Sequence, residues 1–519
     1  MFSLLIKNAT IVDGSGQKSK VSDVAVEGDK IVAVKPNITA GAKQSFDGTG
    51  LILAPGFIDV QNHSDSYWQL FDNPQLHSLI AQGYTTILVG NSGTSLAPLI
   101  SEQSLKSIQK WQSTQGLNVN WRTFAEYSAQ LVQTNFGCNI ASMIGYSTVR
   151  RGLLGDSLET PTESELSAIL KMVEQSLQEG AFGVSIGLQY SHELNISQVE
   201  LLAVATLCAR YNKLLSVGLR NEMEEVVDSV RELTEIALHT KVKLKIAHLK
   251  IRYRNNWPLL KELLDTVELA WHRGAEVYFD CYPYQFTWQP LYTYLPNWSL
   301  EGGRTHLLTR LNDESLRNKI LLELRNHPAK ISELVIASTD TNLKVTGKSI
   351  SEIAKEMACT SEQAILNLVT AGGSTSMVFD NCMDDATLSG LINHSLALIG
   401  TNGGGFNLEQ GNKLVHPRSF GSAPLFLRQV IDSKSISIEE AIAKLTSRPA
   451  KLLNLKGRGL VATDYQADLV LFDPNKINSY ASISNPYQYP TGVKSVWVNG
   501  EQVVINNTPN GLFAGKFIS

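Results

Sequence analysis

The sequence has little of what marks disulfide-stabilised, membrane-spanning or nucleic-acid-binding proteins. Its 519 residues include 5 cysteines and no CxxC pair, which predicts reduced thiols rather than disulfides or a cysteine zinc site. No uncharged apolar run reaches the roughly 18 residues that span a bilayer, and the apolar part of the N-terminus is too short for a signal peptide. The net charge of −4 gives no basic surface for nucleic acid or anionic membranes. We therefore expect a cytoplasmic protein whose partner is a small-molecule substrate, with homo-oligomerisation left open.

Short alternating apolar and polar runs occur at both ends of the chain. The first 54 residues contain LLIKNATIVDG and DVAVEGDKIVAV, and the same texture returns in ADLVLFD and VKSVWVNGEQVVINN. Asn499-Gly500 is typical of a tight hairpin turn. Because chain ends often lie close together, we predict that residues 1–54 and 455–519 form one composite β-sandwich domain.

The middle of the chain alternates short buried-type strands with helix-sized gaps. Its eight strand candidates are LILAPGFIDV, TTILVG, NIASMIGY, AFGVSIG, LLSVGLR, LKIAHLK, AEVYFDCY and LALIGTN. This alternation is typical of parallel β/α units that close into a barrel. We predict an α/β fold with a (β/α)8 barrel over residues 55–454, and an insertion or lid at about 286–348.

In such barrels, chemistry takes place at the C-terminal ends of the strands. Mostly polar residues stand at the corresponding places in this sequence. They are His63, Asn91, Ser92, Tyr146, Tyr190, Gly218, Arg220, Glu222, His248, Lys250, Tyr282, Tyr284 and Asn402.

Several motifs at these ends, and others beyond them, resemble the amidohydrolase superfamily. PGFIDVQNHSD, TSRPAKLLNLKGRG and ADLVLFD carry the general resemblance. Others resemble the N-acyl-D-amino-acid deacylase (D-aminoacylase) subgroup, in order from about residue 3 to 510: NIASMIGYSTVRRGLLG, EGAFGVSIGLQYSH, AHLK, YPY, HPRSFG and NPYQYPTGVKSVWVNG. The resemblance implies a TIM-like barrel with a small β domain, and hydrolysis of N-acyl amino acids at a zinc centre.

The resemblance also implies six positions that hold one or two zinc ions in the family. In this chain they carry Gln61, His63, Ser92, Gly218, His248 and Asn402. Zinc is held by imidazole, thiolate and carboxylate groups, and only the two histidines keep such a donor. They belong to different halves of the family's binuclear centre, so neither half retains its ligands. We expect no metal cofactor; a single zinc held by His63 and His248 is the alternative.

The replacements at these positions are polar and uncharged. Asn402 stands where the family has an aspartate that acts as general base. An aspartate left there without its metal would be a buried anion costing several kcal/mol, and Asn402 keeps its shape without its charge. Gln61 and Ser92 are neutral as well. Polar rather than bulky apolar replacements favour a pocket that still binds a ligand.

Other family positions are intact. The residues expected to bind substrate are Lys250, Arg418, Tyr284, Tyr190, Arg220, Ser92 and Gln61. The resemblance implies that Lys250, Arg418 and one YPY tyrosine (Tyr284, with Tyr282 as its rival) hold the α-carboxylate of the substrate. A guanidinium pairs a carboxylate bidentately and an ammonium adds a point charge. The alternatives are a structural salt bridge for Arg418 and a solvated surface position for Lys250.

Four residues are candidates for catalysis: His63, His248, Asp65 and Asn402. The two histidines could transfer protons, with Asp65 orienting His63 as a carboxylate–imidazole pair. Glu222 is expected only to hold a neighbouring arginine, Arg220.

Three functions remain open at this point. We favour an enzyme that acts on an N-acyl amino-acid-like molecule without metal, by cyclisation, dehydration or acyl transfer. The second is an N-acyl-D-amino-acid deacylase with a residual single metal. The third is a binding protein that has lost the family activity.

Overall fold

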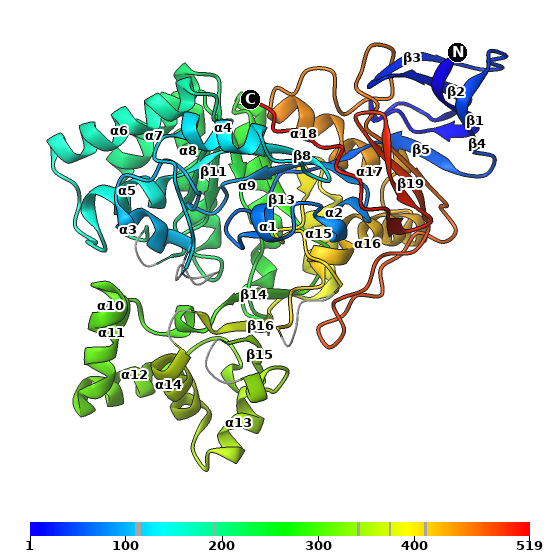
Figure 1. Ribbon diagram of the computed structural model, residues 1–519. Coiled ribbons are helices and arrows are strands. Elements are labelled where there is room, and N and C mark those ends of the chain that lie inside the picture. The colour runs from blue at the N-terminus through cyan, green and yellow to red at the C-terminus, as the bar shows by residue number, and fades with distance from the viewer. Residues whose placement is uncertain (109–115, 191–192, 340–342, 373–374, 409–412) are drawn as a thin grey trace.

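A parallel barrel forms the centre of the protein (Figure 1). The computed structural model describes residues 1–108, 116–190, 193–339, 343–372, 375–408 and 413–519. The barrel strands are β6 (Phe57–Asp59), β7 (Tyr84–Val89), β8 (Asn139–Ser142) continued by β9 (Ile144–Gly145), β10 (Gly183–Gly187), β11 (Leu214–Gly218), β12 (Lys243–Ile246), β13 (Val277–Cys281) and β17 (Ala397–Ile399). A parallel bridge between Asn62 and Gly403 joins the ends of β6 and β17. The predicted α/β barrel fold is confirmed.

Helices cover the outside of the barrel, and neighbours such as α6, α7, α8 and α9 pack in chain order. Capping boxes start several of them: Thr162 with Glu165 at α6, and Ser197 with Glu200 at α7. The helices of the barrel are α1 (Gln69–Asp72), α2 (His77–Ile80), α3 (Glu102–Leu105), α4 (Phe124–Val132), α5 (Tyr146–Leu154), α6 (Glu163–Gln178), α7 (Gln198–Arg210), α8 (Val226–Thr240), α9 (Leu260–His272), α15 (Asp385–Asn393), α16 (Arg418–Ser433), α17 (Ile438–Leu445) and α18 (Ser447–Leu452).

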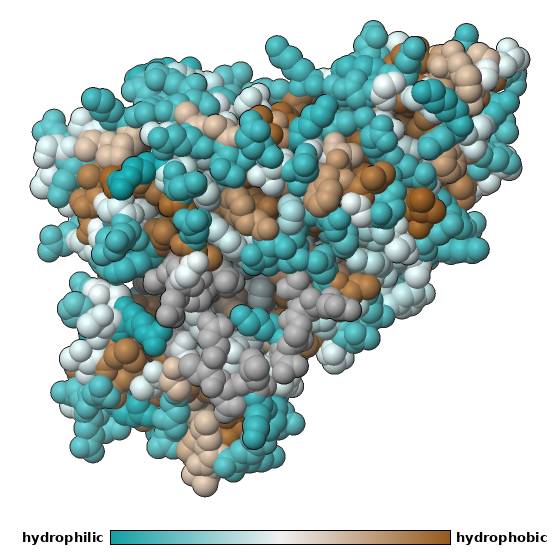
Figure 2. Space-filling view, viewed as in Figure 1, coloured by the Kyte–Doolittle hydropathy of each residue, from teal (hydrophilic) through white to brown (hydrophobic). Residues whose placement is uncertain are grey.

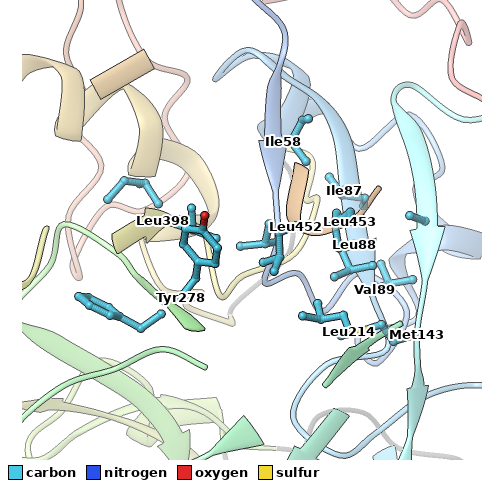
Figure 3. Close-up of a cluster of buried hydrophobic side chains, with 14 of the residues drawn as sticks. Ile58, Ile87, Leu88, Val89, Met143, Leu214, Tyr278, Leu398, Leu452 and Leu453 are labelled. Carbon is cyan, nitrogen blue, oxygen red and sulfur yellow. The ribbon is translucent and has the colours of Figure 1, made fainter. Parts of the chain in front are cut away.

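Apolar side chains fill the space between strands and helices. Figure 3 shows Ile58, Leu88, Leu214 and Leu398 from four barrel strands, with Leu452 from α18; all belong to one buried cluster. Burying such a side chain contributes roughly 1.5–3 kcal/mol. This cluster makes the barrel a rigid frame for the polar residues at its strand ends.

Strands from both chain ends share one sheet, in the order β21-β20-β19-β18-β5-β1-β2-β3, with β4 beside β1. The link between the two ends is the antiparallel pair of β5 and β18. Asn499 and Gly500 have φ angles of 49° and 85° and connect β19 to β20, as a two-residue hairpin requires. The strands are β1 (Phe2–Ile11), β2 (Lys20–Glu27), β3 (Lys30–Lys35), β4 (Ala42–Asp47), β5 (Ile52–Pro55), β18 (Leu469–Phe472), β19 (Val493–Val498), β20 (Glu501–Ile505) and β21 (Thr508–Pro509). The domain boundaries at 54–55 and 454–455 stay a prediction.

A separate lobe lies beside the barrel (Figure 1). It has a core of its own, which includes Leu307, Ile320, Ile353 and Val369. Its elements continue past residue 348, where the insertion was predicted to end, because β16 completes the sheet begun by β14. They are β14 (Phe286–Pro290), α10 (Asn297–Leu300), α11 (Gly303–Asn312), α12 (Glu314–Arg325), β15 (Val335–Ser338), α13 (Ile350–Glu356), α14 (Ser361–Gly372) and β16 (Met377–Asn381).

The surfaces of the barrel and of the lobe are mainly polar in the view of Figure 2, with apolar residues scattered over them. None of the helices in the described ranges is long and apolar enough to cross a bilayer. All five cysteines are free thiols, as predicted.

Candidate functional site

A cavity of about 190 Å³ lies between the barrel mouth and the lobe. This volume suits a small molecule rather than a folded partner. Six of the predicted site residues line it: Tyr190, Arg220, His248, Lys250, Asn402 and Arg418. The lobe contributes Trp288, Gln289, Thr293, Asn297 and His327. Gln61, His63, Asp65 and Ser92 are buried next to the strand ends and do not belong to the lining.

Three of the predicted positions have an unusual backbone. Ser92, His248 and Asn402 have φ angles of 54°, 40° and 45°. Positive φ is uncommon for residues other than glycine, and such conformations cluster at functional sites. The strand ends therefore hold these side chains in directions that regular strand geometry would not give.

His248, Lys250 and Glu222 form one hydrogen-bonded group at the cavity wall. Lys250 Nζ lies 2.6 Å from Glu222 Oε1 and 3.0 Å from His248 Nδ1. An ammonium donates and cannot accept, so Nδ1 accepts and the proton of the neutral imidazole is on Nε2. That nitrogen lies 3.3 Å from Nε2 of Gln189, which also lines the cavity. Because both nitrogens are then donors, this contact is a hydrogen bond only with the carboxamide turned so that Oε1, which otherwise has no partner, faces the imidazole.

The charges of this group follow from burial and from one another. Burial, and then the Lys250 ammonium, lower the pKa of His248, so its imidazole is neutral near pH 7. Burial alone would raise the pKa of Glu222, but Lys250 and His248 hold it well below its usual range. The group therefore combines a fixed ion pair with a neutral imidazole that has an N–H donor on Nε2.

Glu222 was expected to hold Arg220, and the structure differs. Arg220 Nε lies 3.0 Å from Glu232 on α8, and its two terminal nitrogens donate to the carbonyls of Leu194 and Ile196. Glu222 instead pairs with Lys250, because the loops after β11 and β12 bring the two side chains together.

Gln189 fills the space beside Gly218. A Cβ atom at Gly218 would lie 2.4 Å from Gln189 Oε1, so any side chain at 218 would displace the carboxamide. The absence of a side chain at this position is thus what lets Gln189 reach His248. Sequence reasoning missed Gln189, since only the close approach at Gly218 indicates it.

Lys245 of β12 lies in the barrel interior next to Gln61. Its ammonium donates to Gln61 Oε1 and lies 2.7 Å from Asp280 Oδ1, and both charged side chains are fully buried. Gln61 Nε2 donates in turn to Ser92 Oγ at 3.2 Å. Burial lowers the pKa of Lys245 and the Asp280 carboxylate opposes this shift. Sequence reasoning also missed this lysine, although a lysine inside a buried strand was a usable signal.

His63 and Asn402 contact each other where the neighbouring strands β6 and β17 end. His63 Nε2 lies 2.9 Å from Asn402 Oδ1. The Asp65 carboxylate accepts from the Gly90 amide at 2.9 Å, and burial raises its pKa to about 7. The expected role of Asp65 in orienting His63 stays a prediction.

Arg418 begins α16 and is buried under the cavity, with its guanidinium 4.6 Å from the centre of the Tyr282 ring. Tyr282 lines the cavity as well, whereas the hydroxyl of Tyr284 lies 3.4 Å from the Pro417 carbonyl and outside the lining. Within the described ranges, no carboxylate lies within ion-pair distance of Arg418. A buried, stacked guanidinium facing a cavity is suited to bind an anion.

Comparison with known proteins gives the family. Residues 416–504 match the model of an amidohydrolase family. An N-acyl-D-aspartate deacylase of Alcaligenes xylosoxydans xylosoxydans is 30% identical over 502 residues, which cover 96% of this chain and 91% of that protein. The chain belongs to the N-acyl-D-amino-acid deacylases of the amidohydrolase superfamily. This confirms the subgroup indicated by the motifs.

Further deacylases agree with this assignment. A D-aminoacylase of the same organism is 28% identical, with 100% of this chain and 98% of the relative covered. A solved D-aminoacylase described as having a binuclear metal centre superposes with a TM-score of 0.84 at 26% identity, covering 100% and 99% of the two chains. The N-acyl-D-glutamate deacylase of Bordetella bronchiseptica, solved with zinc and a phosphonate inhibitor, has a TM-score of 0.84 at 25% identity and covers 99% of each chain.

The donors that this deacylase-family chain offers do not fit a zinc ion. His63 and His248 each have a ring nitrogen engaged with a polar side chain, and the neighbours Gln61, Ser92 and Asn402 are neutral oxygen or amide groups. Within the described part of the chain, no three histidine, cysteine, aspartate or glutamate side chains are grouped closely enough to hold a metal. A cationic lysine also stands beside Gln61.

Proposed function

We propose that this deacylase-family protein acts on a small N-acyl amino-acid-like molecule by metal-independent acid/base chemistry, of the cyclisation, dehydration or acyl-transfer type. The observation that carries the proposal is Arg418, a buried guanidinium on the cavity that has no carboxylate partner within the described ranges. An isolated buried charge is costly, so an anionic ligand is the natural counter-ion.

The charges around the cavity favour a ligand with a single carboxylate. Three of the cations that line it are already paired with a carboxylate. The pairs are Lys250 with Glu222, Arg252 with Asp380, and Arg220 with Glu232. Among the described cations of the lining, Arg418 is the one without a carboxylate partner, so we infer a monoanion, such as an N-acyl derivative of a neutral amino acid.

Metal independence is supported by the chemistry of the donors. Carboxylate and thiolate ligands neutralise the charge of a zinc ion, and the family positions here supply neither. We therefore derive no step through a metal and assign the chemistry to the side chains present.

His248 is the group best placed to act on the acyl carbonyl. His248 lines the cavity, and a neutral imidazole with its proton on Nε2 can donate to a carbonyl oxygen and polarise it. Lys250, oriented by Glu222, can give a proton to Nδ1 as Nε2 gives up its own, which leaves the amine neutral until it is protonated again. Asn402 lines the same cavity and is oriented by His63, so it can bind the amide of the substrate.

Turnover assays of the H248Q variant test this role. The carboxamide keeps most hydrogen bonding and volume but cannot transfer a proton, so we expect turnover of N-acyl-D-amino acids to fall roughly a hundredfold or more. The matched control is H239Q, because His239 is an exposed histidine of α8 outside the cavity. Equal rates for H248Q and the parent would remove His248 from the mechanism.

The same assay separates the alternatives. A deacylase with a residual metal would lose turnover on chelation in the parent as well as in H239Q. A binding protein would bind the acids through Arg418 and turn over none of them, whichever histidine is changed.

A further inference from the structure

We infer that the ammonium of Lys245 is a built-in cation that replaces a metal ion at the ends of the barrel strands and prevents a divalent metal from binding there. The inference shares with the proposed function the claim that no metal binds. Its test is the zinc affinity of variants, which is independent of any turnover.

The position of Lys245 carries the argument. Its ammonium contacts the side chain of Gln61, which in turn contacts Ser92. Both residues stand at positions where the family resemblance implies zinc ligands. A metal ion held by side chains at 61 and 92 would therefore lie next to a fixed positive charge.

The surroundings of Lys245 are those of a bound cation. The side chain is fully buried, and its partners are a carboxylate (Asp280) and a carboxamide oxygen (Gln61). The second Asp280 oxygen accepts from the backbone amide of His248 at 3.1 Å. Lys245 is thereby linked through Asp280 to the strand end that carries His248, as a structural metal would link two ligands.

A permanent ammonium at Lys245 also explains why the residues around it are neutral. The Gln61 carboxamide oxygen accepts from the ammonium, and its nitrogen donates to Ser92 Oγ. A protonated or metal-binding imidazole at 61 would present no such acceptor to the ammonium. The half of the site around His248 is filled separately, by Gln189 in the space beside Gly218.

Zinc binding by restored ligand sets tests the inference. The triple variant Q61H/S92C/N402D supplies three donors around His63 and retains Lys245; a second protein carries the same changes together with K245M. Methionine keeps most of the length and apolar volume of the lysine without the charge. Zinc affinity of the metal-stripped proteins is measured by competition with a chromogenic chelator.

We expect the protein with K245M to bind one zinc ion at least about a hundredfold more tightly than the triple variant, because like charges a few ångströms apart repel strongly in a buried site. Equal affinities would overturn the inference. Binding by neither protein would overturn it too, since removal of the ammonium would then not admit the metal.

A second set of variants tests whether Lys245 is charged in the native fold. K245M alone leaves Asp280 as a buried, unpaired carboxylate, whereas K245M/D280N removes both charges. We expect K245M to lower the midpoint of urea unfolding and K245M/D280N to recover most of the loss. If K245M unfolds at the parent's midpoint, Lys245 carries no charge there and the inference fails. Circular dichroism of every variant shows whether it is folded, and K245M/D280N replaces K245M in the zinc test if the single change prevents folding.

Discussion

Replacing Arg418 with methionine removes the guanidinium proposed to bind the substrate carboxylate and keeps an unbranched side chain against Tyr282. A hydrogen bond to a charged group contributes roughly 1.5–3 kcal/mol. The loss of even one such bond corresponds to a Kd about tenfold to a hundredfold higher. Since a guanidinium can bind both carboxylate oxygens, this range is a lower bound.

The stability of the ligand-free protein distinguishes a binding role from a structural one. Arg418 has no carboxylate partner within the described ranges, so its removal leaves no buried anion behind. We expect the free energy of unfolding of ligand-free R418M to stay within about 1 kcal/mol of the parent's. A structural ion pair would instead cost roughly 3–5 kcal/mol when one partner is removed.

Calorimetric titration with N-acetyl-D-amino acids and with their primary amides gives the affinities. The parent should prefer the acid to the amide, and R418M should lose that preference. R428M is the matched control, because Arg428 lies on the same helix, is paired with Asp432 and is outside the cavity. Acid binding by R418M at the parent's affinity would refute the assignment, and so would a parent that binds acid and amide equally.

Three further predictions follow from the buried groups around the cavity. First, burial raises the pKa of Asp65 from 3.8 to about 7. Between about pH 4 and 7 the folded state therefore binds a proton that the unfolded state lacks. The stability of the parent should fall as pH rises through this window. D65N should remove this slope and, at pH 8, raise the free energy of unfolding by on the order of 4 kcal/mol; parallel urea curves for parent and variant at pH 5 and 8 would contradict it. Second, K250M leaves Glu222 buried without its cation and should destabilise the protein by roughly 3–5 kcal/mol, with K250M/E222Q restoring most of it; an unchanged midpoint for K250M would show that the pair is not formed. Third, G218A should displace the Gln189 carboxamide and lower turnover, and G218A/Q189A should relieve the clash but not restore the rate; a G218A enzyme with the parent's turnover would show that Gln189 does not support His248.

The sequence predicted the elements whose signal is local. Alternation of buried strands with helix-sized gaps indicated the barrel, and Asn499-Gly500 indicated the hairpin between β19 and β20. The order of the strand ends also placed His248, Lys250 and Asn402 on one cavity.

The parts that escaped prediction depend on contacts between distant residues. Lys245 and Gln61 are 184 positions apart, and no local pattern shows that their side chains meet inside the barrel. The partner of Glu222 depends on two loops: from the sequence it was expected to hold the nearby Arg220, but the fold brings Lys250 to it instead. Likewise, the lobe continues to β16 because that strand pairs with β14, a partner it meets only in the fold.

Turnover measured as a function of bound zinc shows whether the chemistry of this protein needs a metal. The protein is stripped with a chelator, its zinc content is measured by mass spectrometry, and turnover of N-acyl-D-amino acids is followed while zinc is added back. We expect the full rate in the stripped protein, no gain on addition of zinc, and a loss of roughly a hundredfold in H248Q throughout. Turnover that disappears on stripping and returns in proportion to bound zinc would contradict it.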